Sequence, residues 1–352
     1  MAYTTIDNPS ETAFNTKLYT GTGSSNAITG VGFQPDWVWI KDRVDSHSHN
    51  LFDSVRGATK RIHSDTTDVE TTNAESLKSF NSDGFTLGTQ TNVNQSSHTN
   101  VAWCWKAGTS FTNDASATGI GATDSAGSVN ETAGFSVCTY TGVGGTSTTI
   151  KHGLSTAPTV MLIKNRSQDD IDWAVYHQGI GNTHRLYLNS TDASTDAIGT
   201  FRDTSPTSSI FTVGDHASVN TSGETYVAYI FSERQGYSKF GSYTGNGNAD
   251  GTFVYTGFKP AWVMCKITNT TDDWYIFNNK SPGYNDNNKS LRANTSATEA
   301  SASGYSMDIL SNGFKTRTSN YAVNGGSQSY IYMAFAENPF VTGSSGIPTT
   351  AR

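Results

Sequence analysis

The chain has 352 residues, a formal net charge of −7, and only 15% charged residues, against roughly 25% in an average soluble domain. It has no Lys/Arg cluster that could neutralise a nucleic-acid backbone and no apolar run near the ~20 residues of a membrane helix. We therefore expect no nucleic-acid partner and no membrane insertion. Three cysteines are too few for a disulfide framework, and none has a neighbouring cysteine at metal-ligand spacing.

Residues 1–13 form a polar segment, and the first unit of the predicted fold begins at Phe14. Four landmarks follow in this unit. They are Tyr19-Thr20-Gly21, a proline-led apolar run from Pro35 to Lys41, the residue Phe85, and a closing aromatic stretch over 101–105.

The same landmarks recur twice in the same order. The second set is Tyr140-Thr141-Gly142, the run from Pro158 to Lys164, Phe211 and the stretch 226–231. The third set is Tyr243-Thr244-Gly245, the run from Pro260 to Lys266, Phe314 and the stretch 330–335. Recurrence at a fixed period indicates a repeat architecture. We place the repeats at 14–107, 135–233 and 240–337, each of about 95–100 residues.

The joints between the repeats differ in length. Residues 108–134 consist mainly of Gly, Ala, Ser, Thr, Asn and Asp, which is the composition of a linker that is flexible or lies along a surface. Residues 234–239 form a short joint, so the second and third repeats must lie close together. Residues 338–352 form a polar C-terminal tail.

Short segments rich in Val, Ile, Trp, Tyr and Phe, bounded by Gly, Asn, Asp and Ser, recur within each repeat at intervals typical of sandwiches and barrels. The stretch 226–231 is apolar on both faces, as in a central strand covered on both sides. The sequence therefore predicts an all-β fold made of three tandem antiparallel β-sandwich-like repeats.

The aromatic residues could stack on sugars or pack in a core. Those that lie in strand-like runs at equivalent positions of the three repeats are interpreted as core residues. Tyr284, in an unrepeated loop, is the better ligand candidate, although a plain exposed turn is favoured there.

The lysine at the end of each proline-led run is interpreted as a strand-end residue with its stem on apolar surface and its amine in water. These lysines are Lys41, Lys164 and Lys266. Acidic residues follow each of them: Asp42 and Asp45, then Asp169, Asp170 and Asp172, then Asp272 and Asp273. No Ca²⁺ loop pattern or glycosidase pair is evident among them, which favours solvated turns.

His47 and His49 alternate, so on a strand they would face the same way, and three such pairs in a trimer could bind a metal. The other repeats lack this pair and His63 has no clear partner, so we predict no metal. Cys104 and Cys265 stand where other repeats carry isoleucine, which favours small core residues over nucleophiles. The sequence thus defines no catalytic residue, no cofactor and no specific ligand-binding residue.

The repeats share a framework but no polar constellation. An enzyme needs one assembled site and has no reason to triplicate its framework. A display or adhesion protein gains contact area and avidity from each added copy. This contrast favours a non-enzymatic function.

Several segments carry a resemblance to a known group of proteins: 2–9, 33–43, 51–57, 236–245 and 346–352. They are similar to segments of repeat-containing virion proteins of marine bacteriophages, including phages of cyanobacteria, a family with an uncharacterised domain. The resemblance covers essentially the whole chain. It implies a virion component and transfers no catalytic or binding residue.

Together these features predict a virion structural protein that is made in the bacterial cytoplasm and displayed on the particle exterior. We expect a tail fibre-like protein that binds a host-surface glycan or protein and contacts other virion proteins. The alternatives are a capsid decoration or head-fibre protein and a glycan hydrolase. We expect a homo-oligomer, a trimer as in many fibres, although three repeats could also pack around a pseudo-threefold axis within one chain.

Overall fold

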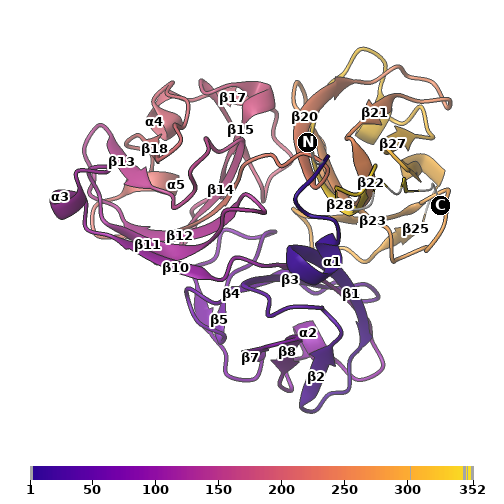
Figure 1. Ribbon diagram of the computed structural model, residues 1–352, viewed down its shortest axis with the longest axis horizontal. Coiled ribbons are helices and arrows are strands. Elements are labelled where there is room, and N and C mark those ends of the chain that lie inside the picture. The colour runs from indigo at the N-terminus through magenta and orange to yellow at the C-terminus, as the bar shows by residue number, and fades with distance from the viewer. Residues whose placement is uncertain (1–2, 302, 344–345, 347, 350–352) are drawn as a thin grey trace.

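The computed structural model describes residues 3–301, 303–343, 346 and 348–349. Residues 1–2, 344–345, 347 and 350–352 of the predicted terminal segments lie outside the described residues. Antiparallel strands are the main regular structure of the described chain and its helices are short, which confirms the predicted all-β class. The strands gather in three lobes around a common centre (Figure 1).

The first lobe follows the short helix α1 (Pro9–Thr12). Its large sheet holds, in spatial order, β1 (Phe14–Thr20), β9 (Thr99–Trp105), β3 (Trp37–Asp42) and β4 (Asn50–Asp53). Its small sheet holds β2 (Asn26–Thr29), β8 (Gly84–Leu87) and β7 (Leu77–Asn81). The remaining elements are the pair β5 (Lys60–Arg61) and β6 (Thr71–Thr72) and the helix α2 (Thr91–Asn94).

The second lobe has an eight-stranded sheet. Its order is β10 (Thr109–Asn113), β11 (Ser125–Asn130), β12 (Phe135–Thr141), β19 (Thr225–Phe231), β14 (Val160–Asn165), β15 (Ala174–His177), β16 (His184–Tyr187) and β17 (Thr195–Asp196). A second sheet pairs β13 (Thr148–Lys151) with β18 (Ile210–Val213). The helical turns are α3 (Ala115–Thr118), η1 (Gln178–Ile180), α4 (Ile198–Phe201) and α5 (Ala217–Asn220).

The third lobe has a six-stranded sheet. Its order is β20 (Ser238–Thr244), β28 (Ser329–Pro339), β22 (Phe258–Ile267), β23 (Trp274–Asn278), β24 (Lys289–Arg292) and β25 (Ala300–Ser301). The small sheet holds β21 (Phe253–Tyr255), β27 (Gly313–Thr316) and β26 (Met307–Leu310). The helical turns are η2 (Ser303–Tyr305) and α6 (Tyr321–Asn324).

Four neighbouring strands have the same order in all three large sheets. In each lobe the strand that closes the repeat (β9, β19 or β28) pairs on one side with the strand that ends at Tyr-Thr (β1, β12 or β20) and on the other with the strand of the proline-led run (β3, β14 or β22). A one-turn helix, α2, α5 or α6, precedes each of the strands that close a repeat. The division into three tandem repeats stays a prediction from the sequence, and the lobes share the framework that it describes.

The segment 108–134, interpreted from its composition as a linker, contains two strands. β10 and β11 extend the edge of the second large sheet through β12. The side chains in this segment are small, so few of them contribute to a core. Val129 is buried in the core of the second lobe, and Phe111 packs against that core. Backbone pairing to an existing sheet edge, rather than side-chain burial, therefore holds most of this segment in place.

Tyr-Thr-Gly serves the same structural role in all three lobes. The tyrosine hydroxyl donates a hydrogen bond to the carbonyl oxygen of a valine in the one-turn helix, as when Tyr140 donates to Val219 at 2.8 Å. The adjacent asparagine, Asn220, donates to the carbonyl oxygens of Gly144 and Gly214. The glycine allows a close approach, because a Cβ on Gly142 would lie 2.2 Å from a backbone oxygen of Thr221. The first and third lobes repeat the tyrosine–valine bond: Tyr19 to Val93 at 2.6 Å and Tyr243 to Val323 at 2.8 Å.

The strands of the large sheets are buried on both faces, as the stretch 226–231 predicted. Alternate side chains point to opposite faces of a strand. In β19, Tyr226, Ala228 and Ile230 pack in the core of the second lobe. Val227, Tyr229 and Phe231 point the other way and join a core that includes residues of all three lobes. The large sheets therefore turn their second faces toward one another.

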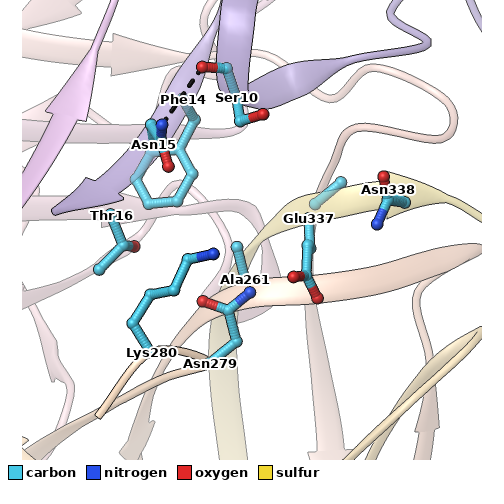
Figure 2. Close-up of a pocket in the computed structure, with 10 residues that line it drawn as sticks. Ser10, Phe14, Asn15, Thr16, Ala261, Asn279, Lys280, Glu337 and Asn338 are labelled. Carbon is cyan, nitrogen blue, oxygen red and sulfur yellow. Dashed lines mark hydrogen bonds between the residues drawn. The ribbon is translucent and has the colours of Figure 1, made fainter. Parts of the chain in front are cut away.

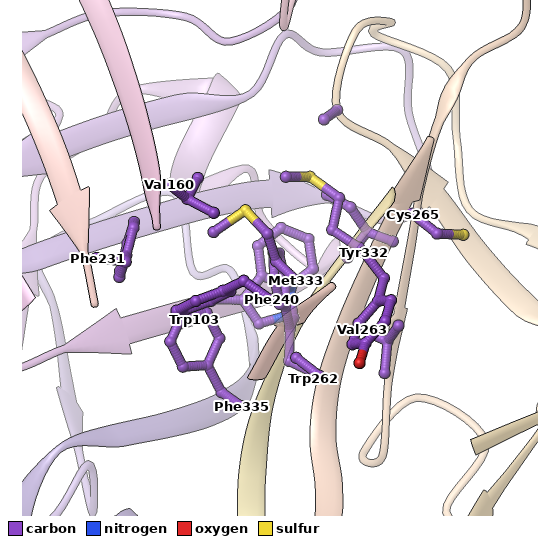
Figure 3. Packing of buried hydrophobic residues seen from close by; sticks show 14 of the residues in the cluster. Trp103, Val160, Phe231, Phe240, Trp262, Val263, Cys265, Tyr332, Met333 and Phe335 are labelled. Carbon is purple, nitrogen blue, oxygen red and sulfur yellow. The ribbon is translucent and has the colours of Figure 1, made fainter. Parts of the chain in front are cut away.

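The core between the lobes is rich in aromatic residues. Trp37 of the first lobe stacks on Tyr229 of the second, with ring centroids 4.3 Å apart. Trp105 meets Trp262 of the third lobe edge-on at 5.8 Å, and Phe231 lies 5.5 Å from Phe335. Figure 3 shows labelled members of this cluster from different lobes side by side. The aromatic residues thus fill a common central core as well as the cores inside the lobes.

Hydrogen bonds between the lobes close a ring. Each lobe uses one ring nitrogen to bond a carbonyl oxygen of another lobe: His49 to Arg292 at 2.9 Å, Trp173 to His63 at 2.8 Å, and Trp274 to Tyr187 at 2.9 Å. Backbone bonds repeat the cycle: Glu299 to Arg43 at 3.0 Å, Glu70 to Arg166 at 2.9 Å, and Ser194 to Thr268 at 2.8 Å. The first lobe contacts the third, the second the first, and the third the second. The three lobes of one chain therefore contact one another in a closed ring.

Candidate functional site

A pocket of about 160 Å³ lies between the first and third lobes (Figure 2). Helix α1 and the start of β1 form one wall, and residues of β22 and β28 and the two residues that follow β23 form the other. At roughly 30 Å³ per molecule, this volume corresponds to about five water molecules. The pocket therefore suits a small polar group rather than an extended cofactor.

Two side chains that line the pocket are buried and have no hydrogen-bond partner among the described residues. They are Asn279, only 2% exposed, and Thr16, 4% exposed. Both the amide nitrogen and the amide oxygen of Asn279 are unpaired, and so is the hydroxyl of Thr16. A buried polar group without a partner costs about 1–3 kcal/mol. These three atoms are closed off from solvent, so a ligand in the pocket would reach this donor, acceptor and hydroxyl after a local shift of the pocket wall.

The other polar groups give the pocket both signs of charge. Figure 2 shows Asn279 between Lys280 and Glu337. The Glu337 carboxylate is paired with the Lys259 ammonium group at 3.3 Å. Asn15 donates its amide to the carbonyl oxygen of Val31 at 2.9 Å, so this donor is engaged within the protein. The buried amide of Asn279, in a wall that carries lysine and glutamate side chains, suits a polyhydroxylated ligand.

The comparisons with known proteins give one result for the chain as a whole. A family model described as a domain of unknown function, DUF7483, matches residues 8–339. The chain belongs to this family. No curated protein and no solved structure matches it. The DUF7483 domain spans all three lobes and both walls of the pocket, and none of its described helices is long and apolar enough to cross a membrane.

The lysines at the ends of the proline-led runs differ from the prediction, because their amines are not in water. Lys41, Lys164 and Lys266 are buried in the DUF7483 domain. The Lys164 ammonium group donates to the carbonyl oxygens of Ile171 at 2.7 Å and of Thr67, in the first lobe, at 2.9 Å. The Lys266 ammonium group donates to Ile267 at 2.8 Å and to Thr191, in the second lobe, at 3.2 Å. Lys164 and Lys266 thus provide hydrogen-bond donors for loop carbonyl oxygens at the interfaces between lobes.

Burial should give Lys164 a distinctive pH dependence. Desolvation lowers its pKa to about 8, against about 10.4 in an unfolded chain. Between these values the unfolded state binds more protons than the folded state, so this lysine makes unfolding less favourable as pH rises. We expect the stability difference between the wild type and Lys164→Met to grow from about pH 8 to pH 10, measured by urea denaturation at each pH.

Tyrosines and cysteines titrate in the wild type and in the variant alike. Their contribution to the free energy of unfolding therefore cancels in the difference between the two proteins. Lys78→Met, which alters a half-exposed lysine, is the control for the replacement of a lysine at the surface. A constant difference for Lys164→Met would show that this amine does not release its proton in the folded state.

The predicted acidic-loop residues lie in turns and do not converge on one another. Asp172 accepts a hydrogen bond from the Asn189 amide at 2.7 Å, and Asp273 accepts one from Asn294 at 2.8 Å. Asp169 accepts the backbone N–H of Val69, in the first lobe, at 3.3 Å. The other loop carboxylates also bond locally: Asp45 to the Ser46 N–H and Asp272 to the Asp273 N–H and the Tyr275 hydroxyl, while Asp170 occupies a turn with a φ of 57°.

The two alternating histidines do not face the same way. His49 is buried, accepts a hydrogen bond from the Trp39 indole at 2.7 Å, and bonds the carbonyl oxygen of Arg292. Desolvation lowers its pKa well below the usual range. His63 also has a clear structural partner, because its Nδ1 lies 2.6 Å from the carbonyl oxygen of His49. His47 instead lies beside Asp42 in the loop after β3.

The remaining candidates lie where the sequence interpretation placed them. Cys104 and Cys265, like Cys138, are buried thiols whose pKa is raised by burial. Tyr284 is 71% exposed, the largest exposed fraction among the exposed large hydrophobic residues. It is not among the residues that line the pocket.

Proposed function

We propose that this protein is a non-enzymatic structural protein on the exterior of a bacteriophage particle, where it binds the host surface in the manner of a tail fibre. The observation that carries the proposal is the union of three lobes of one framework around a shared buried core. Such a body holds three sets of loops at fixed relative positions. The resemblance of the chain to virion proteins of marine phages supports the particle as its place.

The ligand class follows from the pocket between the first and third lobes. A primary amide offers a donor and an acceptor side by side, which matches two neighbouring hydroxyl groups. Asn279 presents such an amide, buried and unpaired, with the Thr16 hydroxyl in the same pocket. We therefore assign a host-surface saccharide as the receptor class, with one sugar residue entering the pocket.

Competition for adsorption tests this proposal. Free wild-type protein should reduce adsorption of the phage that carries it, because it occupies the same receptors. Asn279→Ala should need roughly tenfold more protein for the same reduction, since a lost hydrogen-bonding pair costs on the order of 1–2 kcal/mol. The measurement is the number of unadsorbed phage against the concentration of added protein.

Asn269→Ala is a matched control. It removes an exposed amide that bonds only near Gln328 and Ser329, at the far end of β22 from the pocket residue Ala261. This variant should compete like the wild type. Absence of competition by the wild type would contradict receptor binding, and equal competition by Asn279→Ala would contradict the assignment of the pocket.

A further inference from the structure

The first lobe carries a cluster of three side chains with metal-ligand chemistry. Asp42 ends β3, His47 lies in the following loop, and His98 immediately precedes β9. One ligand atom from each of them lies within 4.8 Å of the other two, and these residues form the only such group in the described part of the chain. The Asp42 side chain is fully buried, while the two imidazoles are about one-fifth exposed.

The two imidazoles converge on one carboxylate oxygen. Asp42 Oδ2 lies 3.1 Å from His47 Nδ1 and 2.7 Å from His98 Nδ1. A tetrahedral Zn²⁺ ion with bonds of about 2.0–2.1 Å holds its ligand atoms about 3.3 Å apart. The two distances from Asp42 Oδ2 differ from this value by only a few tenths of an ångström, and the two imidazole nitrogens lie within 4.8 Å of each other, so the rings need only a local shift to surround such an ion. The partial exposure of both rings leaves an approach for the ion and for a water molecule as fourth ligand.

The second carboxylate oxygen of Asp42 fixes the site in place. Asp42 Oδ1 accepts the backbone N–H groups of Val44 at 2.9 Å and Asp45 at 3.1 Å, which aims Oδ2 at the histidines. His98 Nε2 lies 2.7 Å from the side-chain amide nitrogen of Gln95, so a neighbouring group orients this ring. A hydrogen bond to the second ring nitrogen is the usual support of a metal-binding histidine. With the ion bound, Nε2 carries the proton of the ring, and a half-turn of the Gln95 amide would bring its oxygen into the place of its nitrogen to accept that proton.

The other two lobes show that the turn does not need these histidines. Strand register places Asn165 and Ile267 at the position of Asp42, and Glu224 and Gln328 at the position of His98. Asn165 makes the same turn with its side-chain oxygen, which accepts the N–H groups of Ser167 and Gln168 at 3.0 Å. The same fold thus stabilises this turn without any imidazole. The turn after β3 in the first lobe therefore does not need His47 and His98 for its stability.

The charges around the cluster are also compatible with a cation. The Lys41 ammonium group is engaged by the carbonyl oxygens of Asp42 at 2.6 Å and Asp45 at 3.2 Å. The Asp45 carboxylate belongs to the same loop and accepts the Ser46 N–H. With a divalent ion bound at Nδ1, each neutral imidazole carries its proton on Nε2 instead, and the Asp42 carboxylate offsets one of the two positive charges of the ion.

The geometry points to a binding site for one divalent transition-metal ion of the Zn²⁺ class, with Asp42 Oδ2, His47 Nδ1 and His98 Nδ1 as its protein ligands. This site is separate from the proposed saccharide pocket and does not depend on the proposed function. Two imidazoles and one carboxylate favour Zn²⁺ or Co²⁺ over Ca²⁺ or Mg²⁺, which prefer oxygen ligands.

Isothermal titration calorimetry, in which Zn²⁺ is added to the full metal-free chain, tests the site. The wild type should bind one equivalent per chain, and Co²⁺ should give the visible absorption of a tetrahedral complex. His98→Gln, which introduces the residue found at this position in the third lobe, should bind at least tenfold more weakly. His184→Gln, which removes a histidine outside the cluster, should bind like the wild type.

Asp42→Asn provides a second variant, because Asn165 shows that asparagine maintains this turn in the second lobe. It should also weaken Zn²⁺ binding by tenfold or more while the circular dichroism spectrum remains that of the wild type. Absence of a Zn²⁺ equivalent in the wild type would overturn the proposal. Unchanged binding by both His98→Gln and Asp42→Asn would overturn it as well.

Discussion

Arg56→Ala is expected to lower the free energy of unfolding by about 3–5 kcal/mol, because it leaves buried charges without their partner. The Arg56 side chain is fully buried, forms an ion pair with Asp53, and lies 2.9 Å from Glu70. It also donates to the Tyr229 hydroxyl of the second lobe at 3.1 Å. Truncation would leave the Asp53 carboxylate without its cation inside the interface between the first two lobes. Urea denaturation monitored by tryptophan fluorescence measures the effect.

The control for Arg56 is an ion pair of the same sequence spacing at the surface. Lys78 and Glu75 are 3.3 Å apart and nearly half exposed. Exposed pairs contribute little, so Lys78→Ala should leave the denaturation midpoint of the wild type unchanged. A similar midpoint for Arg56→Ala and Lys78→Ala would contradict a buried network that joins the two lobes.

Trp105→Ala is expected to cost about 3–5 kcal/mol, the usual range for truncation of a fully buried aromatic residue. Trp105 is fully buried and stacks on Trp37 with ring centroids 4.3 Å apart. It also contacts Phe231 of the second lobe and Phe335 of the third. The cavity would therefore open in the core that the three lobes share.

Differential scanning calorimetry distinguishes a shared core from three independent ones. We expect a single unfolding transition in the wild type and a single transition at lower temperature in Trp105→Ala. Tyr284→Ala, at a 71% exposed side chain, should unfold like the wild type. Separate transitions, of which Trp105→Ala shifts only one, would show that the lobes unfold independently.

The strands of this protein could be predicted because local sequence patterns determine them. The proline-led runs and the stretches that close each repeat are short, rich in β-formers and bounded by turn residues, and they form β3, β9, β14, β19, β22 and β28. Burial of both faces of β19 could also be read from its continuous apolar sequence. The residues that cover the second face of β19 could not be predicted, because they depend on how the lobes pack and not on neighbours in the sequence.

The same limit explains the lysines and the segment 108–134. A lysine such as Lys164 normally places its amine in water, and its partner Thr67 comes from another lobe, far away in the sequence. The polar composition of 108–134 is typical of a linker, but an open sheet edge at β12 gives β10 and β11 a place to pair. In both cases a tertiary contact decides the outcome.

The candidate sites could not be predicted from the sequence, because they also depend on tertiary contacts. Thr16 and Asn279 line the same pocket only because the first and third lobes pack against each other, and neither residue belongs to a recognisable motif. His47 could be singled out by its spacing from His49, but its neighbours in space are Asp42 and His98. The pairing of β3 with β9 brings these two residues together, and that pairing joins segments more than 50 residues apart.

Display on the virion is the central claim, and antibody-gold labelling of intact phage particles tests it most directly. Antibodies raised against the purified chain should label the exterior of the particle, and a tail fibre-like protein should place the gold at the tail. Gold on the head instead would contradict the fibre assignment and indicate a decoration or head-fibre protein. Intact particles without label, from a phage whose lysate contains the chain, would contradict display on the virion altogether.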